Sequence, residues 1–347
     1  MSTVYVLGAG ASAGYHNSYI GETSPVSKNF FPKAVKVMSW HNINGRNFND
    51  ENVTYNHLFN FIYRFWGIKQ DCIGSSNVEI DMEEVLTLLH IEMEENPHCQ
   101  ALKKACREYM LLMALTFDKI LYGSPCPHHQ KIANSLQPGD VVISFNYELL
   151  MDNALMATKS WYPGDGYGVK CNLLSSEVFT ADNSSAVHLL KLHGSLNWLY
   201  CTRCRQLFTA VETAGENIRF ICNHSSRVLC THMGCRHPLI PIIIPPTMMK
   251  NYDSMPFTQK LWRLARTALA NAHHIIIIGY SLPPTDFRTK WLFRKAMHES
   301  TVPKKVTLVN HATGEKLQKL IQQYSSLMRT DDVNSYPTIA HYASTLS

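Results

Sequence analysis

The sequence contains no long apolar run. Its most hydrophobic segments, residues 242–244 and 275–278, are far shorter than the roughly 18 apolar residues that mark a membrane-spanning helix. No basic stretch precedes the first apolar residues, so no secretory signal peptide is predicted. Internal repeats and low-complexity tracts are also absent, so neither a repeat architecture nor a segment of biased composition is expected.

Charged residues are scarce as well. They make up 17% of the 347 residues, against 45% hydrophobic residues, which is typical of a globular protein. The net charge is +5, but Lys and Arg are scattered along the chain, so direct binding to nucleic acid or to a membrane is not expected. Because no export signal accompanies the ten cysteines, we expect thiols or metal ligands rather than disulfides, in a cytoplasmic protein.

Short apolar runs alternate with amphipathic segments over most of the chain. Strands are predicted at residues 4–7, 141–145, 187–192, 274–278 and 306–309, and helices at 149–157, 257–272, 286–298 and 315–324. Strands that are apolar throughout, separated by helices, are typical of a parallel sheet covered on both faces. The sequence therefore predicts an α/β fold with a Rossmann-like, doubly wound parallel sheet.

A second group of helices is predicted between the first two strands. Residues 81–84 resemble a capping box ahead of a helix, and residues 100–122 have helical periodicity. We therefore expect a mostly helical insertion over residues 31–135, with residues 1–30 and 136–347 forming the main domain. Residues 23–80 give no clear assignment of elements.

Glycine follows the first predicted strand. Gly8, Ala9, Gly10 and Ser12 belong to a G-x-G-x-x-A pattern, in which glycines let the backbone approach a pyrophosphate. The alternative interpretation is a simple glycine-rich turn.

Polar residues follow four further strands. In a parallel sheet these positions face one crevice outside the carboxyl ends of the strands, where an amide orients a ribose hydroxyl or water and a histidine acts as general base. Taken singly, each is also explained as a turn, capping or packing residue. The residues are Asn146, Glu148, His193, Gly279, Ser281 and Asn310.

Two cysteine pairs lie in the stretch that has no helical period. Cys201 and Cys204 are separated by two residues, Cys230 and Cys235 by four, and the pairs by 25 residues. Four thiolates at this spacing predict a closed, structural Zn²⁺ site in a small zinc ribbon over residues 198–240. Free cysteines are the alternative interpretation, and the rival ligands are Cys222, His224 and His232.

Together and in this order, these motifs resemble the sirtuin family, outside the region of about 30 to 135. The resemblance implies NAD⁺ bound between a Rossmann-like domain and a zinc lobe, with cleavage of the nicotinamide–ribose bond. The residue matching Asn146 would order ribose or water, and His193 matches the general base. Contacts with NAD⁺ are expected from Gly8, Ala9, Gly10, Ser12, Glu148, Gly279, Ser281 and Asn310.

The chain also departs from the sirtuin deacylases. Residues 15–25 lack their Ile-Pro-Asp-Phe-Arg segment, and Glu148 stands where they have Asp. Where those enzymes have a Phe-Gly-Glu strand that pairs with the acyl-lysine peptide, residues 241–250 contain three prolines, which disfavour strand addition. Together with Phe-Asn-Tyr at 145–147, Pro-Pro-Thr at 245–247 and Gly-Tyr-Ser-Leu-Pro at 279–283, this pattern is similar to divergent bacterial sirtuin-like proteins of antiphage systems, which hydrolyse NAD⁺.

The function expected from this resemblance is that of an NAD⁺ glycohydrolase acting in antiphage defence, with NAD⁺ as substrate and Zn²⁺ as a structural ion. An NAD⁺-dependent protein lysine deacylase and a non-catalytic NAD⁺ or ADP-ribose sensor are the alternatives. An unregulated NAD⁺ hydrolase would deplete the NAD⁺ of its own host. We therefore expect its activity to be held in check in a homo-oligomer or in a complex with a regulatory defence protein such as a DNA translocase.

Overall fold

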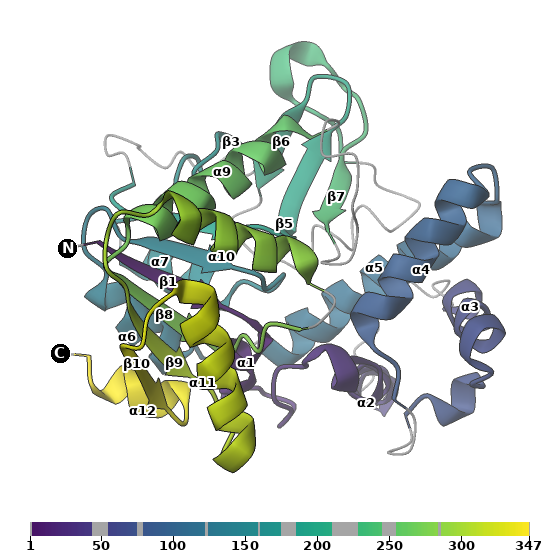
Figure 1. Ribbon diagram of the computed structural model, residues 1–347. Coiled ribbons are helices and arrows are strands. Elements are labelled where there is room, and N and C mark those ends of the chain that lie inside the picture. The colour runs from purple at the N-terminus through teal and green to yellow at the C-terminus, as the bar shows by residue number, and fades with distance from the viewer. Residues whose placement is uncertain are drawn as a thin grey trace.

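The computed structural model describes residues 2–43, 55–74, 79–121, 124–158, 160–174, 185–209, 228–244, 255–283 and 286–346. Figure 1 shows three parts: a main sheet covered by helices, a small lobe with its own sheet, and a group of helices beside them. Within the described part of the chain, every helix is too short or too polar to cross a bilayer.

The main sheet has six strands, all parallel to their neighbours. In order across the sheet they are β10 (Val333–Tyr336), β9 (Lys305–Val309), β8 (His274–Ile278), β1 (Thr3–Leu7), β2 (Val141–Ser144) and β4 (His188–Lys191). The chain builds outward from β1 through β2 to β4, then returns to the other side of β1 for β8, β9 and β10. The order therefore reverses between β1 and β8, as in the doubly wound folds that bind dinucleotides at this point.

Helices cover both faces of the main sheet (Figure 1). On one face α9 (Pro256–Asn271), α10 (Phe287–Glu299) and α11 (Gly314–Met328) lie side by side. The second group consists of α6 (Pro127–Ser135), α7 (Leu150–Ala157) and α12 (Ile339–Ser344). Strands between two helical layers are buried on both sides, which explains the run of four isoleucines in β8.

The third part consists of helices with a hydrophobic core of their own. They are α2 (Phe30–Ile43), α3 (Asn56–Trp66), α4 (Met82–Glu95) and α5 (Gln100–Leu121). Asp81 starts α4, because its carboxylate accepts hydrogen bonds from the backbone amides of Glu83 and Glu84. Tyr147 and Ile243, which lie outside these helices, belong to the same core and join this part to the rest.

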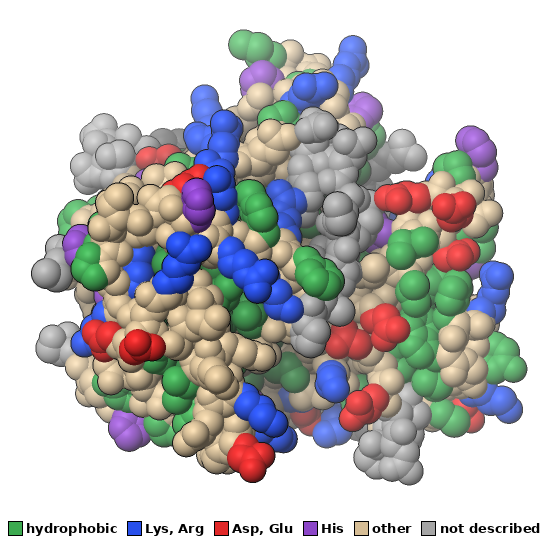
Figure 2. Space-filling model, viewed as in Figure 1, with side chains coloured by type: hydrophobic (Ala, Val, Ile, Leu, Met, Phe, Trp, Pro, Cys, Tyr) green, Lys and Arg blue, Asp and Glu red, His purple; other side chains and the backbone are tan. Residues whose placement is uncertain are grey.

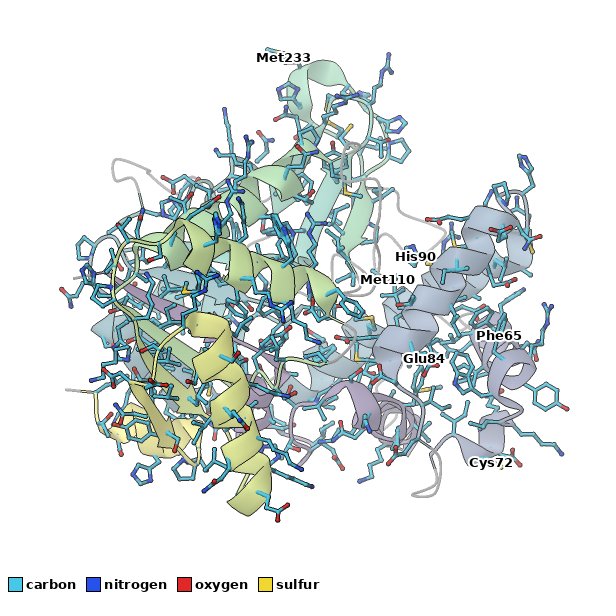
Figure 3. The ribbon with its side chains drawn as sticks, viewed as in Figure 1. Phe65, Cys72, Glu84, His90, Met110 and Met233 are labelled. Atoms are coloured by element: carbon cyan, nitrogen blue, oxygen red, sulfur yellow. The ribbon has the colours of Figure 1, made fainter. Side chains whose placement is uncertain are left out.

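The small lobe is a four-stranded sheet in the order β3, β6, β5, β7. Its strands are β3 (Cys171–Leu173), β5 (Gly194–Cys201), β6 (Gln206–Thr209) and β7 (Ile240–Ile243). Strand β5 begins three residues after β4 of the main sheet ends, so a short connection joins the two sheets. Met233, 93% exposed, projects from the outer end of this lobe (Figure 3).

The predicted doubly wound α/β fold is confirmed. Each of the five predicted strands and each helix predicted around them is present, with ends that shift by a few residues. Helices α2 and α3 occupy the region that the sequence left unassigned, and β10 and α12 were not predicted. Helix α6 falls within residues 31–135 but packs against α7, and its Ile132 and Ala133 belong to the main core.

Candidate active site and metal centre

A cavity of about 1020 Å³ lies at the carboxyl ends of the main-sheet strands. Loops that follow β1, β2, β4, β8 and β9 form one wall, and residues 24–28 and 81–88 form the opposite wall. The ten residues suggested for catalysis or NAD⁺ contact all line it: Asn146, His193, Gly8, Ala9, Gly10, Ser12, Glu148, Gly279, Ser281 and Asn310. Motifs spread over about 300 residues of sequence thus meet in one space.

The loops after β1 and β8 touch through their backbones at the reversal of strand order. The amide of Gly10 donates to the carbonyl oxygen of Gly279 at 2.9 Å. Gly279 has φ +63°, and a β-carbon there would lie 2.1 Å from the backbone nitrogen of Ala11. A β-carbon on Gly8 would lie 2.7 Å from the Gly279 carbonyl oxygen. Only glycine permits this close approach of the two loops.

Asn146 is held by a buried network just after β2. Its side-chain Nδ2 lies 3.0 Å from the Gly8 carbonyl oxygen, from Ser12 Oγ and from Glu148 Oε1. Ser12 Oγ donates to Glu148 Oε1 at 2.5 Å, and the amide of Leu150 donates to Glu148 Oε2 at 2.6 Å. Both carboxylate oxygens of Glu148 are thus satisfied by the protein, which indicates that Glu148 orients Asn146.

The network leaves one side-chain group of Asn146 without a protein partner. None of the described residues donates a hydrogen bond to its Oδ1, although the residue is only 7% exposed. An amide oxygen fixed in this way at the wall of a cavity can accept a hydrogen bond from a bound hydroxyl or water.

His193 follows β4 and lies among aromatic rings. Its ring centre lies 5.1 Å from that of Phe145 and 6.4 Å from those of Tyr147 and Trp262. Burial lowers the pKa of His193 to about 4, and Arg288 acts in the same direction. Asp286 and a hydrogen bond to the backbone of Phe145 act in the opposite direction. The imidazole is therefore neutral at pH 7 and can accept a proton.

A buried ion pair supports the loops that carry Asn146 and His193. Lys191, at the end of β4, lies 2.9 Å from the carboxylate of Asp152 on α7. The same ammonium group donates to the backbone carbonyl of Glu148 at 2.6 Å. A buried charge pair of this kind is costly to break on one side only, so it fixes β4, α7 and the Glu148 loop relative to one another.

Ser281 and Asn310 line the far end of the same cavity. Ser281 is exposed, whereas Asn310 is half-buried and its Oδ1 accepts a hydrogen bond from the amide of Ala312 at 2.9 Å. Asn310 thus has the turn role that was its alternative interpretation, and its Nδ2 is the part of the side chain that can face a ligand.

The opposite wall contains acidic residues that the sequence reasoning did not assign to the site. Glu83, on α4, has no hydrogen-bond donor to its carboxyl group among the described residues. Burial and, to a lesser degree, the carboxylates of Asp81 and Asp286 together raise its pKa to about 8. Asp286, at the start of α10, also acts on the pKa of His193, so it lies near both groups. It accepts hydrogen bonds from Tyr280 Oη and the Thr289 amide.

The sequence pattern around Glu83 and Asp286 was visible, but the start of a helix explained it without a role in the cavity. Residues 81–84 were interpreted as a capping box and residue 286 as the start of a helix, and Asp81 and Asp286 are indeed the N-caps of α4 and α10. Figure 3 shows Glu84 at the first turn of α4, the end of that helix nearer the main sheet. Residues 81–84 line the cavity because this turn of α4 packs against the crevice, and the capping sequence alone does not predict that packing.

The four predicted zinc ligands converge in the small lobe. The sulfur atoms of Cys201, Cys204, Cys230 and Cys235 all lie within 4.8 Å of one another. Two pairs are 3.3 and 3.8 Å apart, far longer than the ~2.05 Å of a disulfide. Tetrahedral zinc with Zn–S bonds of about 2.3 Å places its sulfurs about 3.8 Å apart. The residues present therefore fit a structural Zn²⁺ ion.

Some sequence-based interpretations lie outside the described residues. These are the rival ligands Cys222 and His224, and the prolines at 245 and 246. The remaining rival, His232, is described but is not part of the four-sulfur cluster.

Comparison with known proteins gives a limited result. No family model and no curated protein match the chain. Among solved structures it is similar to one described as "The Structural basis of Sirtuin Substrate Affinity". The two are 16% identical with a TM-score of 0.41, over 99% of this chain and 92% of the other. A similarity of this level does not by itself assign a ligand or an activity to the cavity.

Proposed function

We propose that this chain is an NAD⁺ glycohydrolase, which converts NAD⁺ and water into nicotinamide and ADP-ribose. The observation that carries the proposal is the cavity at the strand-order reversal, where Asn146 and a neutral His193 share one wall. Its volume of about 1020 Å³ is at the upper end of the ~300–1,000 Å³ of small-molecule sites, which suits an extended dinucleotide.

The proposed pyrophosphate site is the glycine crossing, the backbone contact between Gly8 and Gly10 after β1 and Gly279 after β8. Gly8, Gly10 and Gly279 line the cavity without side chains, so a phosphate would lie against the backbone of these loops. The two nucleoside halves would then extend to either side, one toward Asn310 and Ser281 and the other toward Asn146 and His193.

The reaction breaks the bond between ribose C1′ and the nicotinamide nitrogen. The electron pair of that bond goes to nitrogen, so the cationic nicotinamide leaves as a neutral molecule and needs no acid. Water forms the new bond to C1′ and loses a proton. Asn146 Oδ1 would orient the water or a ribose hydroxyl, and His193 would accept the proton. Asp286 lies close enough to affect the pKa of His193, so it would favour the imidazolium that forms.

The physiological role that we propose is antiphage defence. It is supported by the sequence resemblance at residues 145–147 and 279–283 to bacterial sirtuin-like defence proteins. In bacteria that express the chain, NAD⁺ should fall after phage infection and not before it. The variant Asn146→Ala should abolish the fall, and an unchanged NAD⁺ level with the wild-type chain would contradict the defence role.

A deacylase is the second candidate, and one observation favours it. Strand β7 lies at the edge of the small sheet and pairs only with β5 among the described strands, which is the position where a peptide could add. Pro241 within β7 removes one backbone donor, which weakens such pairing. Release of nicotinamide that requires an acetylated peptide would favour the deacylase, and release from NAD⁺ alone favours the glycohydrolase.

Two substitutions test the assignment of the site. Asn146→Ala and His193→Ala should each lower nicotinamide release by about 10²-fold or more, the range of a positioned base. Since Asn146 Nδ2 contacts three acceptors, Asn146→Ala should also lower the melting temperature by a few degrees.

Matched controls come from the same chain. His188 lies at the other end of β4 from His193, and Asn172 lies on β3 away from the cavity. His188→Ala and Asn172→Ala should keep wild-type turnover. A folded His193→Ala protein with near wild-type turnover would remove His193 from the mechanism, and equal losses in the control variants would mean that both effects are structural.

A further inference from the structure

Two adjacent helices together have a net positive charge about as large as that of the whole chain. Helices α9 and α10 contain seven Lys and Arg residues against one acid, Glu299, which gives +6 for the pair. The whole chain has a net charge of only +5, so all other residues together are close to neutral. The seven are Lys260, Arg263, Arg266, Arg288, Lys290, Arg294 and Lys295.

On α10 the cations alternate with exposed aromatic rings. Phe287, Lys290, Trp291 and Arg294 follow one another at i, i+3, i+4 and i+7, so they lie along one side of the helix. Phe287 is 75% exposed and Trp291 is 51% exposed. The ammonium group of Lys290 lies 5.4 Å from the centre of the Phe287 ring. Two large rings in water on a short helix, each next to a cation, are not explained by packing among the residues that the structure describes.

Helix α9 extends the same surface. It packs against α10, and its Lys260 and Arg263 are exposed one turn apart. The single acid of the pair, Glu299, lies at the far end of α10, where it contacts Arg266 and Lys295. Figure 2 shows the Lys and Arg side chains gathered over these two helices, with hydrophobic side chains among them.

We propose that the α9–α10 face binds single-stranded nucleic acid. This face consists of Lys260, Arg263, Phe287, Lys290, Trp291 and Arg294. Exposed rings provide platforms on which bases stack, and the surrounding cations neutralise the phosphates. An acidic protein surface would use the cations but would leave the rings without a role. The proposal goes beyond NAD⁺ cleavage and does not depend on it. It also reverses the expectation from the sequence, because cations that are scattered along the chain become neighbours when the two helices pack.

The test uses the full-length chain without NAD⁺ and a fluorescently labelled, mixed-sequence DNA strand of about 20 nucleotides. Fluorescence anisotropy should show binding at 50 mM salt. If about four phosphates are contacted, affinity should fall roughly 50-fold at 200 mM salt. A duplex of the same sequence should bind more weakly, because its bases are already stacked.

Three variants locate the surface. Trp291→Ala should weaken binding by about tenfold or more, as loss of one stacking ring does. The double variant Arg263→Glu, Arg294→Glu should abolish binding at 200 mM salt. The matched control, Lys103→Glu with Lys104→Glu, makes the same charge change at exposed positions on α5 and should bind as wild type. All of these side chains are exposed, so the melting temperatures should stay close to that of the wild type.

The proposal is overturned by absence of binding at 50 mM salt, or by an affinity that the α9–α10 variants do not change. Binding that Trp291→Ala leaves intact, and that polyglutamate displaces as well as DNA does, would also overturn it, since this result indicates a surface for acidic protein. Nicotinamide release measured on the same preparations keeps this outcome separate from that of the proposed enzyme.

Discussion

The main domain and the small lobe each contain one sheet, of six and four strands, but their cores are very different. The main sheet is buried between two helical layers. Five of its six strands contribute side chains to the hydrophobic core, and Val333 and Tyr336 of the edge strand β10 pack against that core. The local core of the small lobe is five buried residues: Leu199, Cys201, Phe208, Cys230 and Leu239. Two of these five are zinc-ligand candidates. One side of the small sheet packs into the main core through Trp198, Tyr200, Leu207 and Ile242, so only its outer side relies on this small cluster and needs a further constraint.

The difference shows what holds each half of the site. The crevice floor is fixed by backbone contact between glycine loops inside a large core, whereas the outer side of the small lobe has a small core next to four cysteines that fit one metal ion. His193 lies between the two, because β4 ends and β5 begins on either side of it. Its backbone carbonyl accepts a hydrogen bond from the amide of Ile244, after β7. The wall of the cavity that contains His193 therefore contacts both parts of the molecule.

The largest expected effect is the loss of the zinc lobe. Cys204→Ser should unfold the small lobe while the main sheet persists, because the energy of metal binding is folding energy for such a site. Metal analysis should give one zinc per wild-type chain and less than one per variant chain, and hydrogen exchange should show lost protection in β5 and β6. Cys72→Ser, at an exposed thiol on the 3₁₀ turn at Gln70–Cys72, is the control and should change neither. A zinc-free chain with a protected small lobe would contradict this account.

A smaller effect is expected at the glycine crossing. Gly279→Ala adds a left-handed backbone cost of about 1–2 kcal/mol to a steric cost of about 1–3 kcal/mol, so roughly 3 kcal/mol of unfolding free energy should be lost. Gly139 also has a positive φ, +92°, but a β-carbon there meets nothing within 4 Å. Gly139→Ala should therefore show only the backbone part. Denaturant unfolding measures both, and equal losses would mean that the close contact at Gly279 is unimportant.

The smallest effect is a pH dependence in the wall opposite the sheet. Because the folded-state pKa of Glu83 is raised to about 8, its contribution to stability is complete below the unfolded pKa of about 4.3 and is lost as the pH rises through about 8. Glu83→Gln removes this dependence, so its melting temperature should exceed that of the wild type by a few degrees at pH 8.5 and match it at pH 5. Glu84→Gln, at the exposed neighbouring position, should behave as wild type at both pH values. Identical pH profiles for all three proteins would refute the raised pKa.

Local sequence patterns were enough to predict most of the sheet and the cluster of candidate residues. Strand ends such as Asn146 and His193 could be located because an apolar run stops there, and parallel pairing then brings the ends together. The edge strand β10 was not predicted, because its Val-Asn-Ser-Tyr sequence is only half-buried and has no apolar run. The burial of Glu83 and the clustering of cations on the α9–α10 face were not predicted. Both depend on which helices pack together, and residue spacing along the chain does not carry that information.

The most direct test of the central claim is nicotinamide release from NAD⁺ by the purified, zinc-loaded wild-type chain, measured with and without an acetylated peptide. The account predicts nicotinamide and ADP-ribose in equal amounts from NAD⁺ alone, with no acceleration by peptide. Release should also continue down to about pH 5, since the pKa of His193 is about 4. Protein that binds NAD⁺ but releases no nicotinamide under either condition would contradict the account and leave a cofactor-binding protein without catalysis.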